Sequence, residues 1–173
     1  MMVFRHGDTR HTFLWESADQ PSARWHDRGA GPVQYLCDTP AGAWAEFLRH
    51  EEITDPADLS TIRRSLWAIQ IPDEPAATPN LPMATLTGGR ASYRACQAEA
   101  RRIRTTGARR LDAPSAALVP GGAAAERVDG GPGGGPPRDG KVIVLFGRRP
   151  DLIGWVAAEG HPDPRLLSKI RHY

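Results

Sequence analysis

The spacing of hydrophobic and polar positions predicts several short strands. Residues 2–5 are mainly apolar, and apolar residues alternate with polar ones over 33–37 and again over 65–71. Residues 141–146 form a continuous apolar run, which is typical of a strand buried on both faces. Residues 118–119 are expected in one further short strand.

The clearest helical pattern begins after residue 39. Thr39 is a residue type that caps helices, and Pro40 suits the first helical position, where a backbone N–H would have no partner. The pattern continues to about Glu51. Apolar residues recur through it at helical spacing, at Ala43, Trp44, Phe47 and Leu48.

The remaining helices are expected to be fewer and mostly shorter. Residues 92–105 predict an amphipathic helix, with Gly107 as its stop. Shorter helical turns are expected over 59–64 and 164–171. Because strands outnumber long helices, the pattern favours an α+β fold.

Three segments resist regular structure. Residues 16–32 are polar and rich in Gly and Arg, and residues 72–85 contain four prolines. Residues 121–140 contain 8 glycines and 3 prolines, which predicts a flexible surface loop and lacks the Lys-Ser/Thr ending of a phosphate-binding loop. We therefore expect one domain over residues 1–173 that carries a flexible loop at 121–140.

Composition narrows the class of protein without naming a function. A net charge of +2 over 173 residues is too mild to indicate nucleic acid or an anionic membrane as a partner. Cys37 and Cys96 form neither a metal-binding spacing nor a disulfide framework, and the six histidines lack metal spacing. No apolar run is long enough to span a membrane, and the first residues do not resemble a signal peptide. A cytoplasmic domain that binds no metal is expected.

The segment over residues 23–50 brings three chemically different side chains onto consecutive elements. Arg24 lies in the expected loop, Tyr35 on the strand and Glu46 on the helix. Glu46 falls beside the apolar stripe of its helix, at the edge where helix and sheet meet. A carboxylate at that edge can face a cleft.

This segment resembles the signature of the RES domain, a family named after an Arg, a Glu and a Ser. The family's loop Arg with a following aromatic residue, its Gly-Pro, its strand Tyr and its Ala-x-x-Glu helix match Arg24-Trp25, Gly31-Pro32, Tyr35 and Ala43 to Glu46. The family's Pro-Ser-Ala segment matches residues 114–116, after a helix with Cys96-Gln97. Phe4-Arg5 resembles a further Arg of the first strand. Ala23 and His26 depart from the family's usual Gly and Asn, which leaves the detailed substrate contacts open.

The resemblance implies a fold, an activity and a partner. The implied fold is similar to that of ADP-ribosyltransferases, with a small split mixed β-sheet and flanking helices. RES proteins are toxins of toxin–antitoxin pairs that degrade NAD at its nicotinamide–ribose bond, with water or inorganic phosphate as acceptor. NAD is then a substrate, the partner is a helix-turn-helix antitoxin of the Xre type, and a homodimer is a further expectation.

Elementary chemistry agrees with this assignment. Cleavage of an N-glycosidic bond develops positive charge on the ribose, which the Glu46 carboxylate can stabilise while Tyr35 positions the nicotinamide or its ribose. Arg5 and Arg24 are expected to bind the pyrophosphate through forked hydrogen bonds, so Arg24 is counted with Tyr35 and Glu46 in the catalytic set. Ser115 is expected to donate to the ribose or a phosphate, because no motif places a His beside it to activate it as a nucleophile.

Two other functions remain open from the sequence. An ADP-ribosyltransferase breaks the same bond and differs only in its acceptor, a protein or a nucleic acid. Residues 90–110 carry seven arginines against one acid, Glu99, which is a pattern found in nucleic-acid-binding modules. A nucleic-acid binder would show steep salt dependence and release no nicotinamide.

Overall fold

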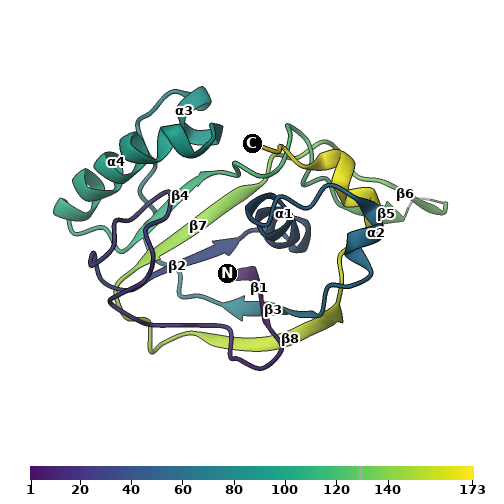
Figure 1. Ribbon diagram of the computed structural model, residues 1–173, viewed down its shortest axis with the longest axis horizontal. Coiled ribbons are helices and arrows are strands. Elements are labelled where there is room, and N and C mark those ends of the chain that lie inside the picture. Colours follow the sequence, from purple (N-terminus) through teal and green to yellow (C-terminus); the bar gives the residue numbers. More distant parts are fainter. Residues whose placement is uncertain (129) are drawn as a thin grey trace.

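The computed structural model describes residues 1–128 and 130–173. Within them the chain has an α+β fold, as the sequence pattern predicts (Figure 1). In chain order the elements, with η for a short 3₁₀ helix, are β1 (Met2–Asp8), β2 (Val33–Cys37), α1 (Pro40–His50), α2 (Pro56–Leu59), β3 (Arg64–Gln70), α3 (Met83–Thr87), η1 (Arg90–Ser92), α4 (Tyr93–Thr105), β4 (Arg110–Pro114), β5 (Glu126–Val128), β6 (Pro132–Gly134), β7 (Lys141–Phe146), β8 (Ile153–Gly160) and η2 (Pro164–Lys169).

Six of the strands form one sheet in the order β4-β7-β2-β1-β3-β8. All the strand pairs described for it are antiparallel, so the mixed pairing that we expected is limited to isolated parallel bridges such as Ala77–Leu111. The reason lies in the connection through α1. It carries the chain from β2 across β1 to β3, so these two parallel strands are separated by the strand with which both pair.

The sheet is split between its two central strands. β1 and β2 are in register at one residue pair only, Phe4 with Cys37. β1 pairs with β3 over seven residue pairs and β2 with β7 over five, so each half of the sheet is continuous. The halves β4-β7-β2 and β1-β3-β8 therefore diverge from a shared point, and the sheet curves around α1 (Figure 1).

Helix α1 is fixed against this curved sheet by its apolar stripe and by its cap. The side chain of Thr39 accepts a hydrogen bond from the Gly42 N–H at 3.0 Å, and Pro40 occupies the first turn, as predicted. One core cluster joins the stripe to strand, loop and C-terminal residues, among them Cys37, Ala43, Trp44, Phe47, Leu48, Leu66, Leu118 and Leu166. The helix face that bears Glu46 is held at the split of the sheet.

Helix α4 covers the other half of the sheet. Its buried residues Cys96, Ala100 and Ile103 pack with Leu111 of β4 and Val144 of β7. In Figure 1 this helix and α3 lie on the side of the molecule opposite to η2. Gly107 ends the helix region with φ +83°, a backbone conformation that favours glycine, as its predicted role as a stop requires.

The strands predicted over 33–37, 65–71 and 141–146 are confirmed, each to within one residue at either end. The strand over 2–5 is confirmed and extends to Asp8. The prediction for 118–119 was wrong, because Leu118 makes only an isolated bridge to Ile170. The sequence pattern also missed β4 and β8, the two edge strands of the sheet.

The helical predictions have a similar outcome. The helices over 40–51 and 92–105 are confirmed, and the last turn is a 3₁₀ helix, η2. The helix predicted over 59–64 was wrong, because the Asp55 side chain caps a turn that begins at Pro56, and β3 already begins at Arg64. In the 121–140 segment β5 and β6 form a small hairpin. Its residue 129 lies outside the described residues, and the flexibility of this segment stays a prediction.

Candidate functional site

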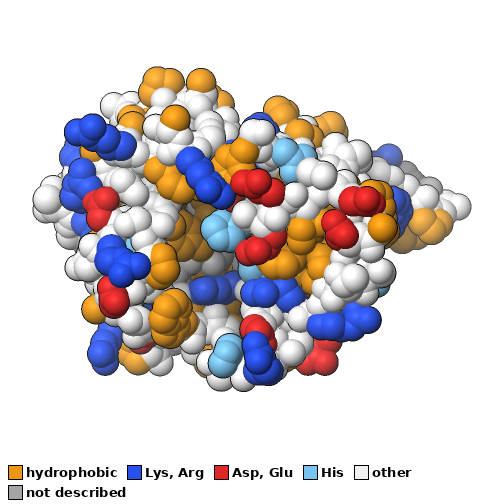
Figure 2. Space-filling model, viewed as in Figure 1, with side chains coloured by type: hydrophobic (Ala, Val, Ile, Leu, Met, Phe, Trp, Pro, Cys, Tyr) orange, Lys and Arg blue, Asp and Glu red, His pale blue; other side chains and the backbone are white. Residues whose placement is uncertain are grey.

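A cavity of about 370 Å³ opens where the two halves of the sheet diverge. Its walls come from β1, β2, α1 and the loop before β2, joined by Tyr93 of α4 and by Tyr173. Figure 2 shows the hollow on this face, with Lys, Arg and His side chains beside hydrophobic ones. Its volume lies within the range of about 300–1,000 Å³ that is usual for small-molecule sites. Arg5, Arg24, Tyr35 and Glu46, which the sequence singled out, all line it.

Glu46 is a partly buried carboxylate of the cavity wall, and Ser115 holds it from behind. The Ser115 hydroxyl donates to Glu46 Oε1 at 3.2 Å and accepts from the backbone N–H groups of Ala117 and Leu118. Burial raises the pKa of the Glu46 carboxyl above its ordinary value of 4.5, while the Ser115 hydrogen bond and the nearby Arg49 oppose that rise. Ser115 itself is buried and is not one of the lining residues. The Ser115 hydroxyl is therefore in direct contact with Glu46, and the contact with substrate that the sequence predicts for Ser115 stays a prediction.

Tyr35 lines the cavity with its ring and fixes the neighbouring loop with its hydroxyl. The hydroxyl oxygen accepts from the Trp25 N–H at 3.0 Å and lies 2.9 Å from His26 Nδ1. Burial raises the pKa of the Tyr35 phenol and lowers the pKa of His26, so both groups are neutral at neutral pH. His26, one of the two departures from the family pattern, thus supports the tyrosine that the pattern retains.

Arg24 lines the cavity, but its guanidinium group already has several protein partners. Nη2 donates to the Gly88 carbonyl at 2.5 Å, and Nη1 donates to the Thr85 carbonyl and, at 2.9 Å, to Ser92 Oγ. The group also lies 4.7 Å from the centre of the Tyr93 ring. Arg24 therefore ties the segment between α3 and α4 to the rim of the cavity, in addition to presenting positive charge to it.

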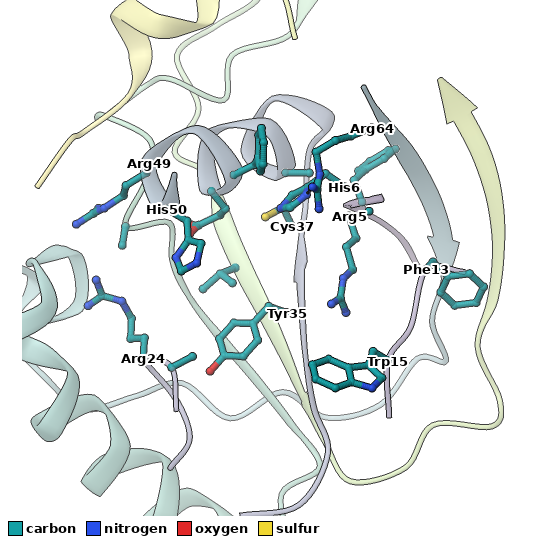
Figure 3. A pocket seen from close by; sticks show the side chains of 18 of the residues that line it. Arg5, His6, Phe13, Trp15, Arg24, Tyr35, Cys37, Arg49, His50 and Arg64 are labelled. Atoms are coloured by element: carbon teal, nitrogen blue, oxygen red, sulfur yellow. Dashed lines mark hydrogen bonds between the residues drawn. The ribbon is translucent and has the colours of Figure 1, made fainter. Parts of the chain in front are cut away.

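Arg5 and Arg64 bring two more cations to the opposite side of the cavity, with Tyr35 between the two sides (Figure 3). Arg5 Nη1 donates to Gln34 Oε1 at 2.5 Å, and Arg64 Nε donates to His6 Nδ1 at 3.1 Å. Burial, Arg64 and Arg5 lower the pKa of His6 to about 3. The imidazole is therefore neutral and can accept the hydrogen bond from Arg64.

Arg49 is a cavity residue that the sequence motif did not mark. It follows Glu46 by one helical turn, is only 3% exposed, and donates from Nη2 to the Gly88 carbonyl at 3.0 Å. Its Nε and Nη1 are buried without a hydrogen-bond partner among the residues that the structure describes. The signal available in the sequence was its spacing, since residues three apart on a helix share a face.

The charge balance of the cavity is strongly positive. Four arginines line it, whereas its lining carboxylates are Glu46 and Asp8, and Asp8 is paired with Arg10 at 2.9 Å. The Cys37 thiol faces the same cavity, but burial raises its pKa well above the ordinary value, so it is protonated and a poor nucleophile. The arrangement suits an anionic, partly aromatic ligand on which positive charge develops near Glu46.

The arginine-rich segment over 90–110 is largely engaged within the chain. Arg101 pairs with Asp27, Arg102 with Glu99 and Arg110 with Asp112. Arg104 donates to a backbone carbonyl and lies over the Phe146 ring. The positive charge of this segment is therefore partly offset within the chain, and binding of a nucleic acid by it stays an alternative prediction.

Potential metal ligands do not cluster within the described ranges 1–128 and 130–173. These residues contain no group of three or more His, Cys, Asp or Glu side chains placed to hold a metal ion. No helix within the same ranges is long and apolar enough to cross a membrane.

Comparisons with known proteins agree with the sequence signature. A chain of the crystal structure of the M. tuberculosis MbcT–MbcA toxin–antitoxin complex superposes with a TM-score of 0.59 at 16% sequence identity. The match covers 96% of this chain and 86% of that one, which shows a shared fold. No curated protein matches the sequence. The family model of the RES domain matches residues 3–162, and the chain therefore belongs to the RES-domain family.

Proposed function

We propose that this protein is the toxin of a toxin–antitoxin pair and that it degrades NAD by cleaving the nicotinamide–ribose bond. The observation that carries the proposal is the cavity itself, in which one carboxylate, Glu46, lies among four arginines and several aromatic rings. NAD offers matching chemistry, with a pyrophosphate for the cations and flat bases for the rings.

The reaction needs little covalent help from the protein. When the bond between nicotinamide and the ribose C1′ breaks, both bonding electrons leave with nicotinamide, and positive charge develops on the ribose. A Glu46 carboxylate beside that carbon stabilises the charge and orients the acceptor, whose oxygen forms the new bond to C1′. With water, the products are ADP-ribose, nicotinamide and a proton; with inorganic phosphate, ADP-ribose 1″-phosphate replaces ADP-ribose.

The surrounding residues favour this route over a covalent intermediate. The Ser115 hydroxyl is engaged with Glu46 and with two backbone amides, and the Cys37 thiol is protonated. Both therefore lack the activation that a nucleophile requires. Arg5 and Arg24 remain our candidates for pyrophosphate binding, and Tyr35 for positioning the nicotinamide or its ribose.

Nicotinamide release by the purified protein tests the proposal. We expect NAD to be consumed by the wild type and not by Glu46→Gln, while Arg94→Met, an exposed arginine of α4 that does not line the cavity, serves as the matched control. Reactions with and without inorganic phosphate identify the acceptor. Release that requires an added protein or nucleic acid would instead indicate a transferase, and full activity of Glu46→Gln would remove Glu46 from the mechanism.

The proposed partner is an antitoxin of the Xre helix-turn-helix type that occludes the cavity in the cytoplasm. The MbcT–MbcA structure supports the pairing, because it contains a protein of this fold with its antitoxin. Co-purification of this chain with the product of an adjacent helix-turn-helix gene, together with loss of nicotinamide release in the complex, is the expected result. A complex that retains full activity would contradict occlusion.

A further inference from the structure

Arg49 carries hydrogen-bond donors that the described part of the protein leaves unused. The side chain is only 3% exposed, and Nε and Nη1 have no partner there. A buried charged donor without an acceptor is unfavourable, so such groups normally pair with an acid or a ligand. Because Arg49 lines the cavity, a ligand in the cavity can supply the missing acceptors.

A second guanidinium group lies beside it. Arg24 Nη2 and Arg49 Nη2 both donate to the Gly88 carbonyl, at 2.5 Å and 3.0 Å. Neither arginine forms a salt bridge within 4.0 Å to a carboxylate of residues 1–128 or 130–173. Glu46 attracts both cations without forming a salt bridge to either, and a doubly charged anion bound between the two guanidinium groups offsets their mutual repulsion.

Two tyrosines hold this arginine pair in place. The Arg24 guanidinium lies 4.7 Å from the Tyr93 ring centre, and that of Arg49 lies 4.5 Å from the Tyr173 ring centre. The two phenol oxygens are 3.0 Å apart and hydrogen-bonded. Stacking of this kind fixes the planes of both cations before a ligand arrives, which lowers the entropy lost on binding.

We propose that Arg49 and Arg24, held by Tyr93 and Tyr173, form the subsite for the pyrophosphate of the dinucleotide. This inference rests on the proposed function, because NAD supplies the pyrophosphate. Arg49 is the residue that it adds to the sequence-based candidates. Arg5 and Arg64, on the opposite side of the cavity, differ from Arg49 in that neither has a buried nitrogen without a partner among the described residues. Glu46, one helical turn before Arg49, then lies next to the ribose that follows the pyrophosphate.

Direct binding tests the subsite independently of catalysis. Calorimetry with inorganic pyrophosphate, ADP-ribose and adenosine is expected to show that Arg49→Met weakens the first two by about ten- to a hundredfold. Adenosine lacks phosphate, so its affinity is expected to stay unchanged. Arg94→Met, which removes an exposed arginine next to Tyr93, is expected to bind all three like the wild type.

A melting curve separates binding from a merely structural role. Exchange of a buried charge for an apolar side chain of similar size is often neutral or stabilising, so the Tm of ligand-free Arg49→Met is expected not to fall. The stabilisation by pyrophosphate is expected to disappear. Should Arg49→Met fail to fold, Arg49→Lys keeps the charge, removes the planar fork, and is expected to weaken pyrophosphate binding at least about tenfold.

The outcomes distinguish this inference from the proposed function. Wild-type affinity for pyrophosphate in folded Arg49→Met or Arg49→Lys would overturn the subsite, even if NAD is cleaved. Arg49-dependent pyrophosphate binding without nicotinamide release would support the subsite and refute the proposed reaction.

Discussion

Replacement of Ser115 by Ala tests whether this serine acts through Glu46 or touches the substrate. The hydroxyl accepts from the N–H groups of Ala117 and Leu118 at 3.2 Å each, and the variant leaves both buried donors without that acceptor. An unsatisfied buried donor costs about 1–3 kcal/mol. The Ala117 N–H also donates to the Glu46 carboxylate, so Leu118 is the donor that loses its acceptor completely, and the expected cost is about 1–3 kcal/mol.

Thermal unfolding measures this cost. A chain of this length loses about 2–4 °C in Tm for each kcal/mol, so Ser115→Ala is expected to melt about 2–12 °C below the wild type. Ser168→Ala, which removes an exposed hydroxyl bonded to a backbone carbonyl, is the control and is expected to stay within about 0.5 kcal/mol. An unchanged Tm in Ser115→Ala would show that the two amides do not depend on the hydroxyl.

The pH dependence of nicotinamide release then separates the two roles. The hydroxyl lowers the pKa of Glu46, so its removal raises that pKa and moves the acidic limb of the profile to higher pH. If Ser115 acts through Glu46 alone, the KM measured on the high-pH plateau stays close to the wild-type value. An unmoved acidic limb together with a raised KM would refute this reasoning and return Ser115 to the role of a substrate ligand.

Three further predictions follow from the same contacts. Burial raises the pKa of Glu46 in the folded state, so the contribution of Glu46 to stability is fully present below pH 4.5 and is lost as pH rises through the raised pKa. Glu46→Gln is therefore expected to gain stability relative to the wild type toward neutral pH. A constant difference between the two proteins in urea unfolding from pH 4 to 8 would contradict this. Thr39→Ala removes the acceptor for the Gly42 N–H and is expected to cost about 1 kcal/mol in the same unfolding measurement, whereas no loss would show that the cap is dispensable. Tyr35→Phe leaves the Trp25 N–H without its acceptor and is expected to lower both Tm and NAD affinity through the loop; an unchanged Tm with lower affinity would instead indicate a direct hydroxyl contact with NAD.

The parts of the fold that the sequence predicts are those in which local chemistry and burial agree. Thr39 and Pro40 define the start of α1 by capping and by fixed backbone geometry, and both features depend only on neighbouring residues. Residues 141–146 are apolar on both faces because Val142, Val144 and Phe146 pack in one core cluster and Ile143 and Leu145 in another. Such signals are readable from one sequence since no distant contact is needed to interpret them.

The edge strands lacked such a signal. β8 contains the apolar residues Ile153, Trp155 and Val156, but it is exposed along most of its length, so these residues do not form the buried face that an alternating pattern indicates. β3 alone supplies its partner in the sheet. β4 alternates between polar Arg110 and Asp112 and apolar Leu111 and Ala113, but with only two apolar residues before Pro114 the pattern is too short to predict a strand. The antiparallel order of the sheet was equally hidden, because it depends on α1 carrying the chain across β1.

The residues of the candidate site were likewise only partly predictable from the sequence. Arg5, Arg24, Tyr35 and Glu46 were found because the family signature orders them along the chain, and all four line the cavity. Arg49 has no place in that signature. Its importance depends on burial and on unused donors, which are properties of the folded chain.

The family signature identifies Arg24 as a site residue but does not determine what its side chain does. The sequence assigned it to phosphate binding, and the structure shows its guanidinium bonded to carbonyls of the segment before α4. These assignments are compatible because the shared Gly88 carbonyl places Arg24 against Arg49, whose own donors remain unused. Arg24 therefore still contributes its positive charge to the cavity, although its guanidinium donates to the carbonyl that also binds Arg49. Loss of Arg24 is therefore expected to disturb Arg49 as well, so the effects of replacing the two residues should not add.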